Sequence, residues 1–398
     1  MTATAELLER GRDRVLALPG WAQALAVYLA ARLLTALITD RVARFQAANG
    51  WTAAQPDYLD LAGIWDGDWY RKIAESGYPQ PLPVGPDGQP VQSEWAFFPA
   101  FPLIVRVAGQ VTGAEWRLAA PTVALLLGAA AAVVVHRLFA DRAGHAVALA
   151  GVAVLAVFPS SPVLQYAYTE SLALLCLALA LLLLTRRRYL WALAPVAVLA
   201  MTRPVALPFA LVVAAHLAAR WRARRSDPLP GTQSVALVLL GLGSVAAGLT
   251  WPLMVGLATG DLGAYMQIQS AWRGAQDVVW LTPWWSMSQY LLGAWVGPLL
   301  LVAMVAGFVV VLASRRARVM GPDLTSWCAA YGLYLLAVVE PYTSIFRFLL
   351  LLFPLALVVA ATVRARGHLL TWLAASLGLQ LVWIVWLWRF TPPSDFPP

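Results

Sequence analysis

The sequence is poor in the charged residues that soluble proteins carry on their surfaces. Only 12% of its 398 residues are charged, and its only lysine is Lys72. Its two cysteines, Cys176 and Cys328, fall inside apolar runs and give no indication of the redox compartment. The chain also lacks a glycine-rich phosphate loop of the Walker type and an H-E-x-x-H zinc pattern. The sequence therefore offers no recognisable site for nucleotide chemistry.

Apolar residues, in contrast, make up 61% of the chain, and the mean hydropathy is +0.70, far outside the range of soluble domains. A membrane span needs roughly 20 apolar residues, and such segments follow one another almost from end to end. The predicted fold is an all-α polytopic membrane protein, with residues 1–398 forming one transmembrane domain in a lipid bilayer. The N-terminal residues mix acids with arginines and lack a cleavage pattern, so we expect no removable signal peptide.

The net charge of +8 does not predict a nucleic-acid partner, because the arginines fall in short clusters between apolar runs. That distribution is the positive-inside pattern, which assigns the clusters to the cytoplasm. The segment from about 40 to 94 has twice as many acids as bases and is expected outside. Scarce lysine and asparagine beside abundant alanine, arginine and tryptophan suggest a GC-rich bacterial genome. We expect a multi-pass protein of the cell membrane. The arginine clusters lie at 9–14, 137–142, 186–188, 220–225, 315–318 and 364–366.

Neighbouring cytoplasmic clusters must be separated by an even number of crossings, and this parity predicts about 11 transmembrane helices. The first outer loop, 40–117, is large and should carry membrane-parallel amphipathic helices, including a short one after the prolines of "AFFPAFPLIVR". Between Arg188 and Arg220 a broken pair should recess its "MTRP" break into the membrane. The remaining spans are expected near 21–39, 118–138, 145–158, 170–185, 233–257, 289–313, 324–340, 345–363 and 368–388.

The stretch "PDYLDLAGIWDGDWYRKIAES" in the outer loop predicts one amphipathic helix that begins with Asp57 as its N-cap and has Asp60 in its first turn. Its apolar residues recur every three or four positions, so we expect them to anchor the helix in the membrane interface. These apolar residues are Tyr58, Leu61, Ala62, Trp65, Trp69 and Ile73.

Two aspartates of this stretch differ in their helical neighbours. Asp68 has Arg71 and Lys72 three and four residues on, and Arg71 is followed by Glu75, so these charges should pair on the wet face. Asp66 has no cation at such a spacing. A partly desolvated carboxylate has a raised pKa and is a better base than one in water. The alternative is that Asp66 caps a neighbouring helix or pairs with a distant arginine.

The pattern "DGD" also resembles a metal-binding D-x-D motif. On a helix, however, residues i and i+2 diverge by about 200° and chelate poorly. We therefore predict no metal ligands and no cofactor, although a divalent metal stays open.

Three arginines are candidates for holding a phosphate on the outer side, because a guanidinium presents forked donors to phosphate oxygens. Arg203 stands at the "MTRP" break, Arg347 lies just inside an outer loop, and Arg106 lies on the interfacial helix. Each could instead extend its head group to the membrane interface. Glu170 should begin a helix at its outer end, where a structural role or an acceptor contact is possible. The tryptophans of the later outer loop are expected either to form a belt at the membrane interface or to stack on sugar rings. They are Trp272, Trp280, Trp284 and Trp285.

A base and phosphate-binding arginines on the outer side indicate transfer of a sugar from a lipid phosphate. One carboxylate that deprotonates an acceptor hydroxyl is enough for direct inverting displacement, since arginines stabilise the departing phosphate. Such an enzyme needs one carboxylate that acts as a base, and we select Asp66 for this role.

Five segments, "WDGDWYRKIAESGYP", "SEWAFFPAFPLIVR", "FPSSPVLQYAYTESL", "MTRPVAL" and "FRFLLLLFPLAL", together carry a family resemblance. In this order they resemble the second mannosyltransferase of GPI-anchor synthesis, the phosphatidylinositol-glycan class V type, and its bacterial relatives in the GT-C superfamily. The resemblance implies a GT-C-like fold, a polyprenyl-phosphate mannose donor and Asp66 as general base. Asp68 departs from the eukaryotic members, which have no second acid there. We assign acceptor or auxiliary roles to Asp68, Glu170, Tyr168, Trp65 and Tyr70.

The acceptor stays open between a glycolipid, a lipoglycan and a secreted protein. Two other functions also stay open. A transporter or flippase of lipid-linked sugars would need charges that line a path to both faces of the membrane. An enzyme of the same fold could use another sugar, such as arabinose or glucose, because sugar choice depends on hydrogen bonds within the pocket.

Overall fold

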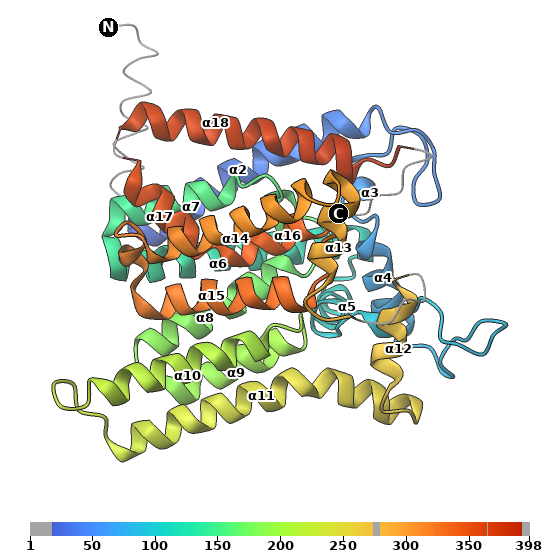
Figure 1. The fold of residues 1–398 in the computed structure, drawn as a ribbon. Helices are drawn as coiled ribbons and strands as arrows, with labels where there is room; N and C mark the ends of the chain where they lie inside the picture. The colour runs from blue at the N-terminus through green and yellow to red at the C-terminus, as the bar shows by residue number, and fades with distance from the viewer. Residues whose placement is uncertain (1–17, 274–278, 364, 392–398) are drawn as a thin grey trace, which may run out of the picture.

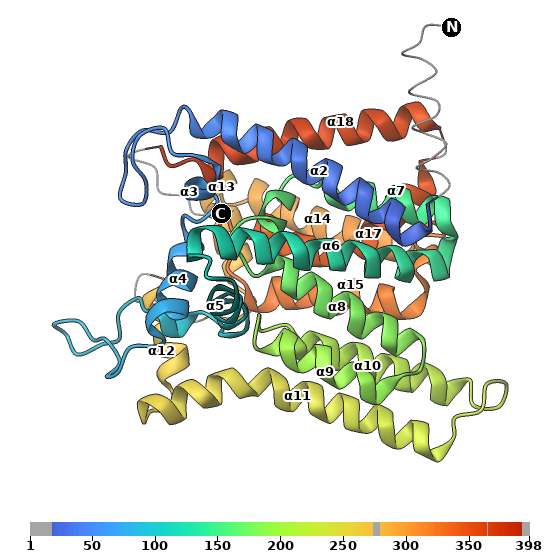
Figure 2. The same cartoon turned by 180° about the vertical axis from the view of Figure 1, so that it is seen from behind.

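The computed structural model describes residues 18–273, 279–363 and 365–391. Within these ranges the chain is helical and has a single isolated β-bridge, between Val84 and Pro90, so the all-α prediction is confirmed. The longer helices lie side by side and run along a common direction, as Figures 1 and 2 show from opposite sides. They are α2 (Gly20–Ala43), α6 (Trp116–Ala143), α8 (Glu170–Thr185), α10 (Ala206–Arg222), α11 (Gly231–Thr259), α14 (Val296–Ala313), α15 (Gly321–Val338) and α18 (Arg366–Trp383).

Five helices of the described chain are long and apolar enough to cross a membrane. They are α2, α6, α11, α14 and α18 together with the π-turn η5 (Ile384–Trp388). A sixth candidate is a bent pair, in which α16 (Ile345–Phe348) and η4 (Leu349–Leu352) meet α17 (Pro354–Thr362) at 69°. Other apolar helices are shorter, among them α7 (His145–Ala156), α8 and α9 (Tyr189–Ala200). The chain is a multi-pass membrane protein, and the number of 11 crossings stays a prediction.

The helix bounds agree with most predicted spans and differ at two. The span predicted near 289–313 is divided, because α13 (Pro283–Leu292) ends before Gly293, whose φ of +85° breaks the helix, and α14 begins at Val296. The span predicted near 345–363 is bent, because Pro354 has no N–H to continue the hydrogen-bond ladder. The break between α9 and α10 covers residues 201–205, as predicted for "MTRP".

The two ends of the helical bundle differ in chemistry. One end, at the left in Figure 1, holds the C-terminal ends of α6, α8, α10 and α14, and with them residues 137–142, 186–188, 220–225 and 315–318. The other end, called here the loop end, carries α3 (Tyr58–Leu61), α4 (Asp66–Ser76), η1 (Glu94–Ala96), α5 (Ala100–Thr112), α12 (Ala264–Ala271) and α13. Helix α5 is seen end-on in Figure 1, so it crosses the direction of the bundle as a membrane-parallel helix should.

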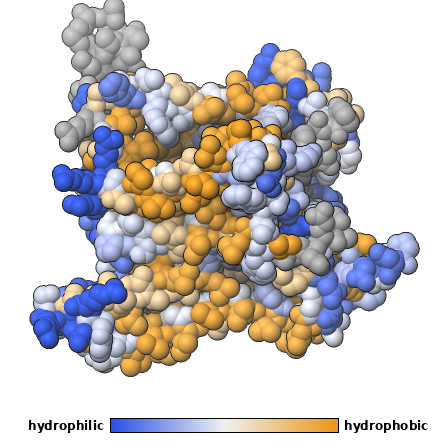
Figure 3. Space-filling view, in the orientation of Figure 1, coloured by the Kyte–Doolittle hydropathy of each residue, from blue (hydrophilic) through white to orange (hydrophobic). Residues whose placement is uncertain are grey.

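The surface between the two ends is mainly apolar, as the orange band in Figure 3 shows. Helices α11 and α14 contribute exposed Leu242, Leu257, Leu299 and Val310 to this surface. Exposed apolar side chains of this kind are compatible with contact to lipid tails, because hydrocarbon is as apolar as they are.

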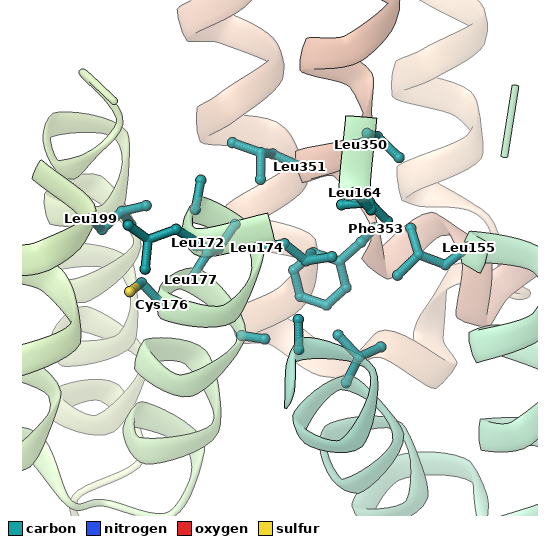
Figure 4. Packing of buried hydrophobic residues seen from close by; sticks show 14 of the residues in the cluster. Leu155, Leu164, Leu172, Leu174, Cys176, Leu177, Leu199, Leu350, Leu351 and Phe353 are labelled. Atoms are coloured by element: carbon teal, nitrogen blue, oxygen red, sulfur yellow. The ribbon is translucent and has the colours of Figure 1, made fainter. Parts of the chain in front are cut away.

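The core is densest around α8, most of whose side chains are buried. Leu172 and Leu174 of this helix pack near Leu350, Leu351 and Phe353, which follow α16 (Figure 4). The same packing therefore fixes the start of α8, which carries Glu170, relative to α16, which carries Arg347.

Candidate functional site

Four charged side chains from four distant parts of the chain meet at the loop end. Arg347 donates from Nη2 to Asp66 Oδ2 at 2.6 Å and from Nη1 to Glu170 Oε1 at 2.9 Å. Arg203 Nη2 lies 2.9 Å from the same Glu170 oxygen. We call Asp66, Glu170, Arg203 and Arg347 the charge cluster. The structure brings these four residues together at one end, and the open alternative that Asp66 pairs with a distant arginine is confirmed.

Asp66 is held by an unusual turn of the backbone. It is the first residue of α4. The preceding Trp65 has φ 61° and ψ −125°, a backbone conformation that residues other than glycine rarely adopt. Trp65 is buried and donates from Nε1 to the carbonyl of Trp388 at 2.9 Å, and Trp388 donates back to Leu61 O at 2.7 Å. Strained residues persist only where the surroundings determine them, and they concentrate at functional sites.

The segment that leads into Glu170 is almost entirely buried although it has little regular structure. Its Tyr168 hydroxyl accepts the backbone N–H of Asp66 at 3.1 Å, and Ala167 N–H donates to Ala62 O at 3.0 Å. The Tyr168 ring also lies 5.1 Å below the guanidinium of Arg347. Segment 157–169 therefore links the start of α4 to the start of α8.

The two arginines of the charge cluster share an aromatic surface. Arg203 lies in the break between α9 and α10, and Arg347 lies in α16. The ring of Phe348 is 4.5 Å from the Arg203 guanidinium and 4.9 Å from that of Arg347. An aromatic face attracts a cation most when both are shielded from water. This arrangement keeps two like charges close together, with Glu170 between them.

The two carboxylates of the charge cluster differ in access to solvent. Glu170 is fully buried and contacts both arginines, whereas the Asp66 side chain keeps 17% of its surface exposed and contacts one. Asp66 is therefore the more accessible of the two carboxylates, and Glu170 lies as a buried counter-ion between the arginines. Burial raises the pKa of the Asp66 carboxyl above its ordinary value of 3.8, against the opposing effect of Arg347. Arg347 Nε is buried without a hydrogen-bond partner among the described residues.

Asp68 behaves as predicted. Its carboxylate contacts Arg71 at 2.6 Å and Lys72 at 3.2 Å, and Arg71 contacts Glu75 at 3.0 Å. Partial burial would raise the pKa of Asp68, but the hydrogen bonds from Arg71 and Lys72 outweigh it and leave the pKa lowered. The Asp68 carboxylate is therefore engaged in ion pairs on the exposed side of α4.

The prediction of one continuous helix from Asp57 was wrong. Asp57 does cap a helix, accepting from Asp60 N–H at 3.0 Å, but α3 ends at Leu61 and α4 begins only at Asp66. Arg117, at the start of α6, pairs with both Asp57 and Asp60. This contact fixes α3 to the bundle, which a local helical pattern does not reveal.

The expectation that the apolar face of α4 sits in the membrane interface was also wrong. Ile73 and Tyr70 are buried within the protein, with Tyr70 against Phe97, Phe101 and Tyr168. Trp69 is half-buried and stacks on Phe97. Tertiary contacts with α5 and the 157–169 segment take the place of lipid.

Arg106 is exposed on α5 and takes no part in the charge cluster. Among the predicted belt tryptophans, Trp280 and Trp285 are exposed, whereas Trp284 donates to Leu335 O and Val339 O, each at 2.9 Å. Trp272 lies against Trp69. Two of the four tryptophans are therefore exposed, and the other two are held by contacts within the protein. Among the described residues, no group of three or more His, Cys, Asp or Glu side chains is arranged to hold a metal ion.

Sequence reasoning missed Arg32, a buried cation in the first span. Its guanidinium donates to the carbonyls of Ala156 and Ser161 and, at 3.0 Å, to Ser161 Oγ, which also accepts from Gln380 at 2.9 Å. No carboxylate of the described chain pairs with it. An arginine in the middle of an apolar span is costly, and that signal was present in the sequence. Arg32 secures the beginning of segment 157–169.

No family model matches this sequence, and no curated protein sequence matches it. In fold the chain is similar to ArnT from Cupriavidus metallidurans, bound to undecaprenyl phosphate, with a TM-score of 0.51 and 16% identity. It is also similar to an Archaeoglobus fulgidus oligosaccharyltransferase in complex with Zn and sulfate, with a TM-score of 0.50 and 15% identity. The matches cover 92% and 94% of this chain, but only 66% and 54% of those two proteins.

These two proteins are glycosyltransferases with the GT-C fold, so this chain has a GT-C fold. The predicted GT-C-like fold is confirmed. The class V family, the mannose donor and the role of Asp66 stay predictions.

Proposed function

We propose that this protein is a membrane-embedded inverting mannosyltransferase that takes mannose from a polyprenyl-phosphate mannose donor, with Asp66 as general base. The observation that carries the proposal is the charge cluster, in which Asp66 is the one carboxylate open to solvent beside two buried arginines. The GT-C fold supports a glycosyltransferase, and a fold neighbour binds undecaprenyl phosphate. Mannose as the sugar rests on the class V motifs alone.

In the proposed reaction, the Asp66 carboxylate accepts the proton of an acceptor hydroxyl. The hydroxyl oxygen then forms a bond to C1 of the sugar from the side opposite the phosphate. The bond between C1 and the phosphate oxygen breaks, and the electron pair leaves with polyprenyl phosphate. Configuration at C1 is inverted by this single displacement. Asp66 afterwards returns its proton to water.

Arg347 and Arg203 bind the phosphate in this proposal. Each guanidinium has five N–H donors, of which the contacts within the charge cluster use only some. A phosphate oxygen competes with Asp66 for Arg347, and this competition frees the carboxylate to act as a base. Fixed donors that meet charge as it develops on a leaving group lower the barrier without reorganisation. The acceptor is a glycolipid, a lipoglycan or a secreted protein, and the site faces the outside of the cell membrane of a bacterium.

The decisive experiment is Asp66→Asn, measured with radiolabelled polyprenyl-phosphate mannose and membranes that contain the overproduced protein. We expect transfer to fall by about 10²- to 10⁴-fold, the usual contribution of a general base. Glu75→Gln is the matched control, because Glu75 is exposed on the same helix in an ion pair with Arg71. Asp66→Asn protein that folds normally and transfers within tenfold of wild type would overturn the assignment of the base.

The same assay separates enzyme from transporter. Label that crosses sealed vesicles without entering a glycosidic product would favour a flippase. Product formed with a polyprenyl-phosphate arabinose or glucose, but not with the mannose donor, would keep the reaction and change the sugar.

A further inference from the structure

A cavity lies at the loop end, between α12, α13 and the end of α15. Its volume is about 430 Å³, within the range of small-molecule sites. Arg273, just after α12, and Glu340, just after α15, lie across from each other, with Arg273 Nε 3.3 Å from Glu340 Oε2. Both side chains are largely buried. The cavity therefore holds an ion pair that the charge cluster does not use.

The other polar groups of this cavity are hydroxyls. Thr282 and Ser286 come from the start of α13, and Tyr290 and Tyr342 add phenol groups at its edge. Tyr342 Oη donates to Glu340 Oε1 at 2.9 Å. Tyr290 is 84% exposed, so its ring is free to contact a ligand. Val279, Pro283 and Met287 complete the lining, so hydroxyls, aromatic rings and one ion pair stand beside apolar groups, as in many small-molecule sites.

The ion pair in the cavity favours a neutral ligand over an anion. Among the residues that the structure describes, Arg273 and Glu340 are the charged ones that line the cavity, and their charges cancel. A phosphate would meet the Glu340 carboxylate and be repelled by it. A neutral polyol can donate one hydroxyl to Glu340 and accept from Arg273, and hydrogen bonds to ionised groups are the stronger kind. The tyrosine rings suit the apolar face of a sugar.

One ring contact joins the surroundings of this cavity to α4, the helix that begins with Asp66. Trp272, which precedes Arg273, lies edge-on to Trp69 with ring centroids 5.2 Å apart, and Trp69 follows Asp66 on α4. The cavity and Asp66 are therefore linked through the packing of α4 against the residues that follow α12.

We propose that this cavity is a carbohydrate subsite in which Glu340 and Arg273 bind sugar hydroxyls. The inference rests on the proposed transferase function and specifies where a sugar of its acceptor or its donor binds. Tyr290 forms one wall. Glu340 is the principal specificity residue, because its carboxylate accepts hydroxyl protons and rejects anions.

The test is direct binding to the purified full-length protein in detergent, by calorimetry with methyl α-mannoside and, separately, inorganic phosphate. We expect Glu340→Gln to weaken mannoside binding roughly tenfold or more, as loss of a hydrogen bond to a charged group does. Tyr290→Ala should weaken it several-fold without affecting folding, because this side chain is exposed. Asp40→Asn, in the exposed pair with Arg44, is the matched control for a lost charge.

Two results would overturn the proposal. One is unchanged mannoside affinity in both Glu340→Gln and Tyr290→Ala. The other is phosphate binding to the wild type that Glu340→Gln strengthens, which would indicate an anion site. Asp66→Asn should retain mannoside binding while losing transfer, so failure of the subsite and failure of the proposed function are distinguishable.

Donor and acceptor sugars are separated by two lipid probes. If the subsite takes the donor sugar, Glu340→Gln weakens binding of polyprenyl-phosphate mannose but not of polyprenyl phosphate. If it takes the acceptor sugar, both lipids bind as in the wild type while the mannoside binds more weakly.

Discussion

Replacing Glu170 with glutamine should destabilise the protein and also reduce turnover. Glu170 has no exposed surface, and its Oε1 lies 2.9 Å from a nitrogen of each of two arginines. Removing one partner of a buried ion pair costs about 3–5 kcal/mol, because a charge is left buried without compensation. Glutamine keeps the shape and one acceptor, so we expect a loss near the lower end, about 3 kcal/mol. Chemical unfolding of the purified protein in detergent measures this loss.

Glu170→Gln should change donor binding and the turnover rate in different ways. Without the carboxylate, Arg203 and Arg347 keep their positive charges with only Asp66 to balance them. A donor phosphate should then bind at least as tightly as before, so KM for the donor should not rise. The rate of turnover should fall, because Asp66 becomes the sole counter-ion of Arg347 and is held more firmly.

Two further variants complete this test. Glu75→Gln removes an exposed carboxylate from a surface ion pair and should change the free energy of unfolding by at most about 1 kcal/mol. Adding Arg203→Met to Glu170→Gln removes one uncompensated cation and should recover part of the lost stability. A Glu170→Gln protein as stable as the wild type, or one whose donor KM rises sharply, would refute the counter-ion reasoning.

The remaining predictions concern the base and its support. Transfer should rise with pH through the pKa of Asp66, which burial raises above 3.8 despite Arg347, so a pH–rate midpoint at or below 3.8 would contradict this role. Tyr168→Phe removes the acceptor of the Asp66 N–H. It should lower the free energy of unfolding by about 1 kcal/mol, measured by chemical unfolding, and it should lower the turnover rate, measured from initial rates. Arg32→Gln should cost about 1–3 kcal/mol and lower the rate per folded molecule, and an unchanged rate would limit Arg32 to a structural role.

Helical spacing predicted the local contacts of the candidate site well. The pairing of Asp68 with Arg71 and Lys72 follows from positions three and four residues apart, so no tertiary information was needed. The same reasoning failed between Ala62 and Trp65, where the helix is interrupted. Contacts from Arg117 to Asp57 and Asp60, and from Trp65 to Trp388, determine that break. A periodic pattern carries no signal for such distant partners.

The surroundings of α4 illustrate a second limit. An apolar helical face predicts burial, but it does not say whether lipid or protein provides the covering surface. Ile73 and Tyr70 are covered by protein. The short α5, which crosses the bundle, supplies part of that cover.

By itself the sequence determined the class of this protein, an all-helical membrane protein, since composition and run length leave no other way to satisfy backbone hydrogen bonds in lipid. It also singled out Asp66, Glu170, Arg203 and Arg347, within a larger set of candidates that included Arg106, since charges in apolar surroundings are costly and therefore conspicuous. Only the tertiary structure decided that Glu170 binds both arginines and that Asp66 alone stays open to solvent. Those relations join residues from α4, α8, α16 and the break before α10, and long-range packing, which no local spacing encodes, brings them together.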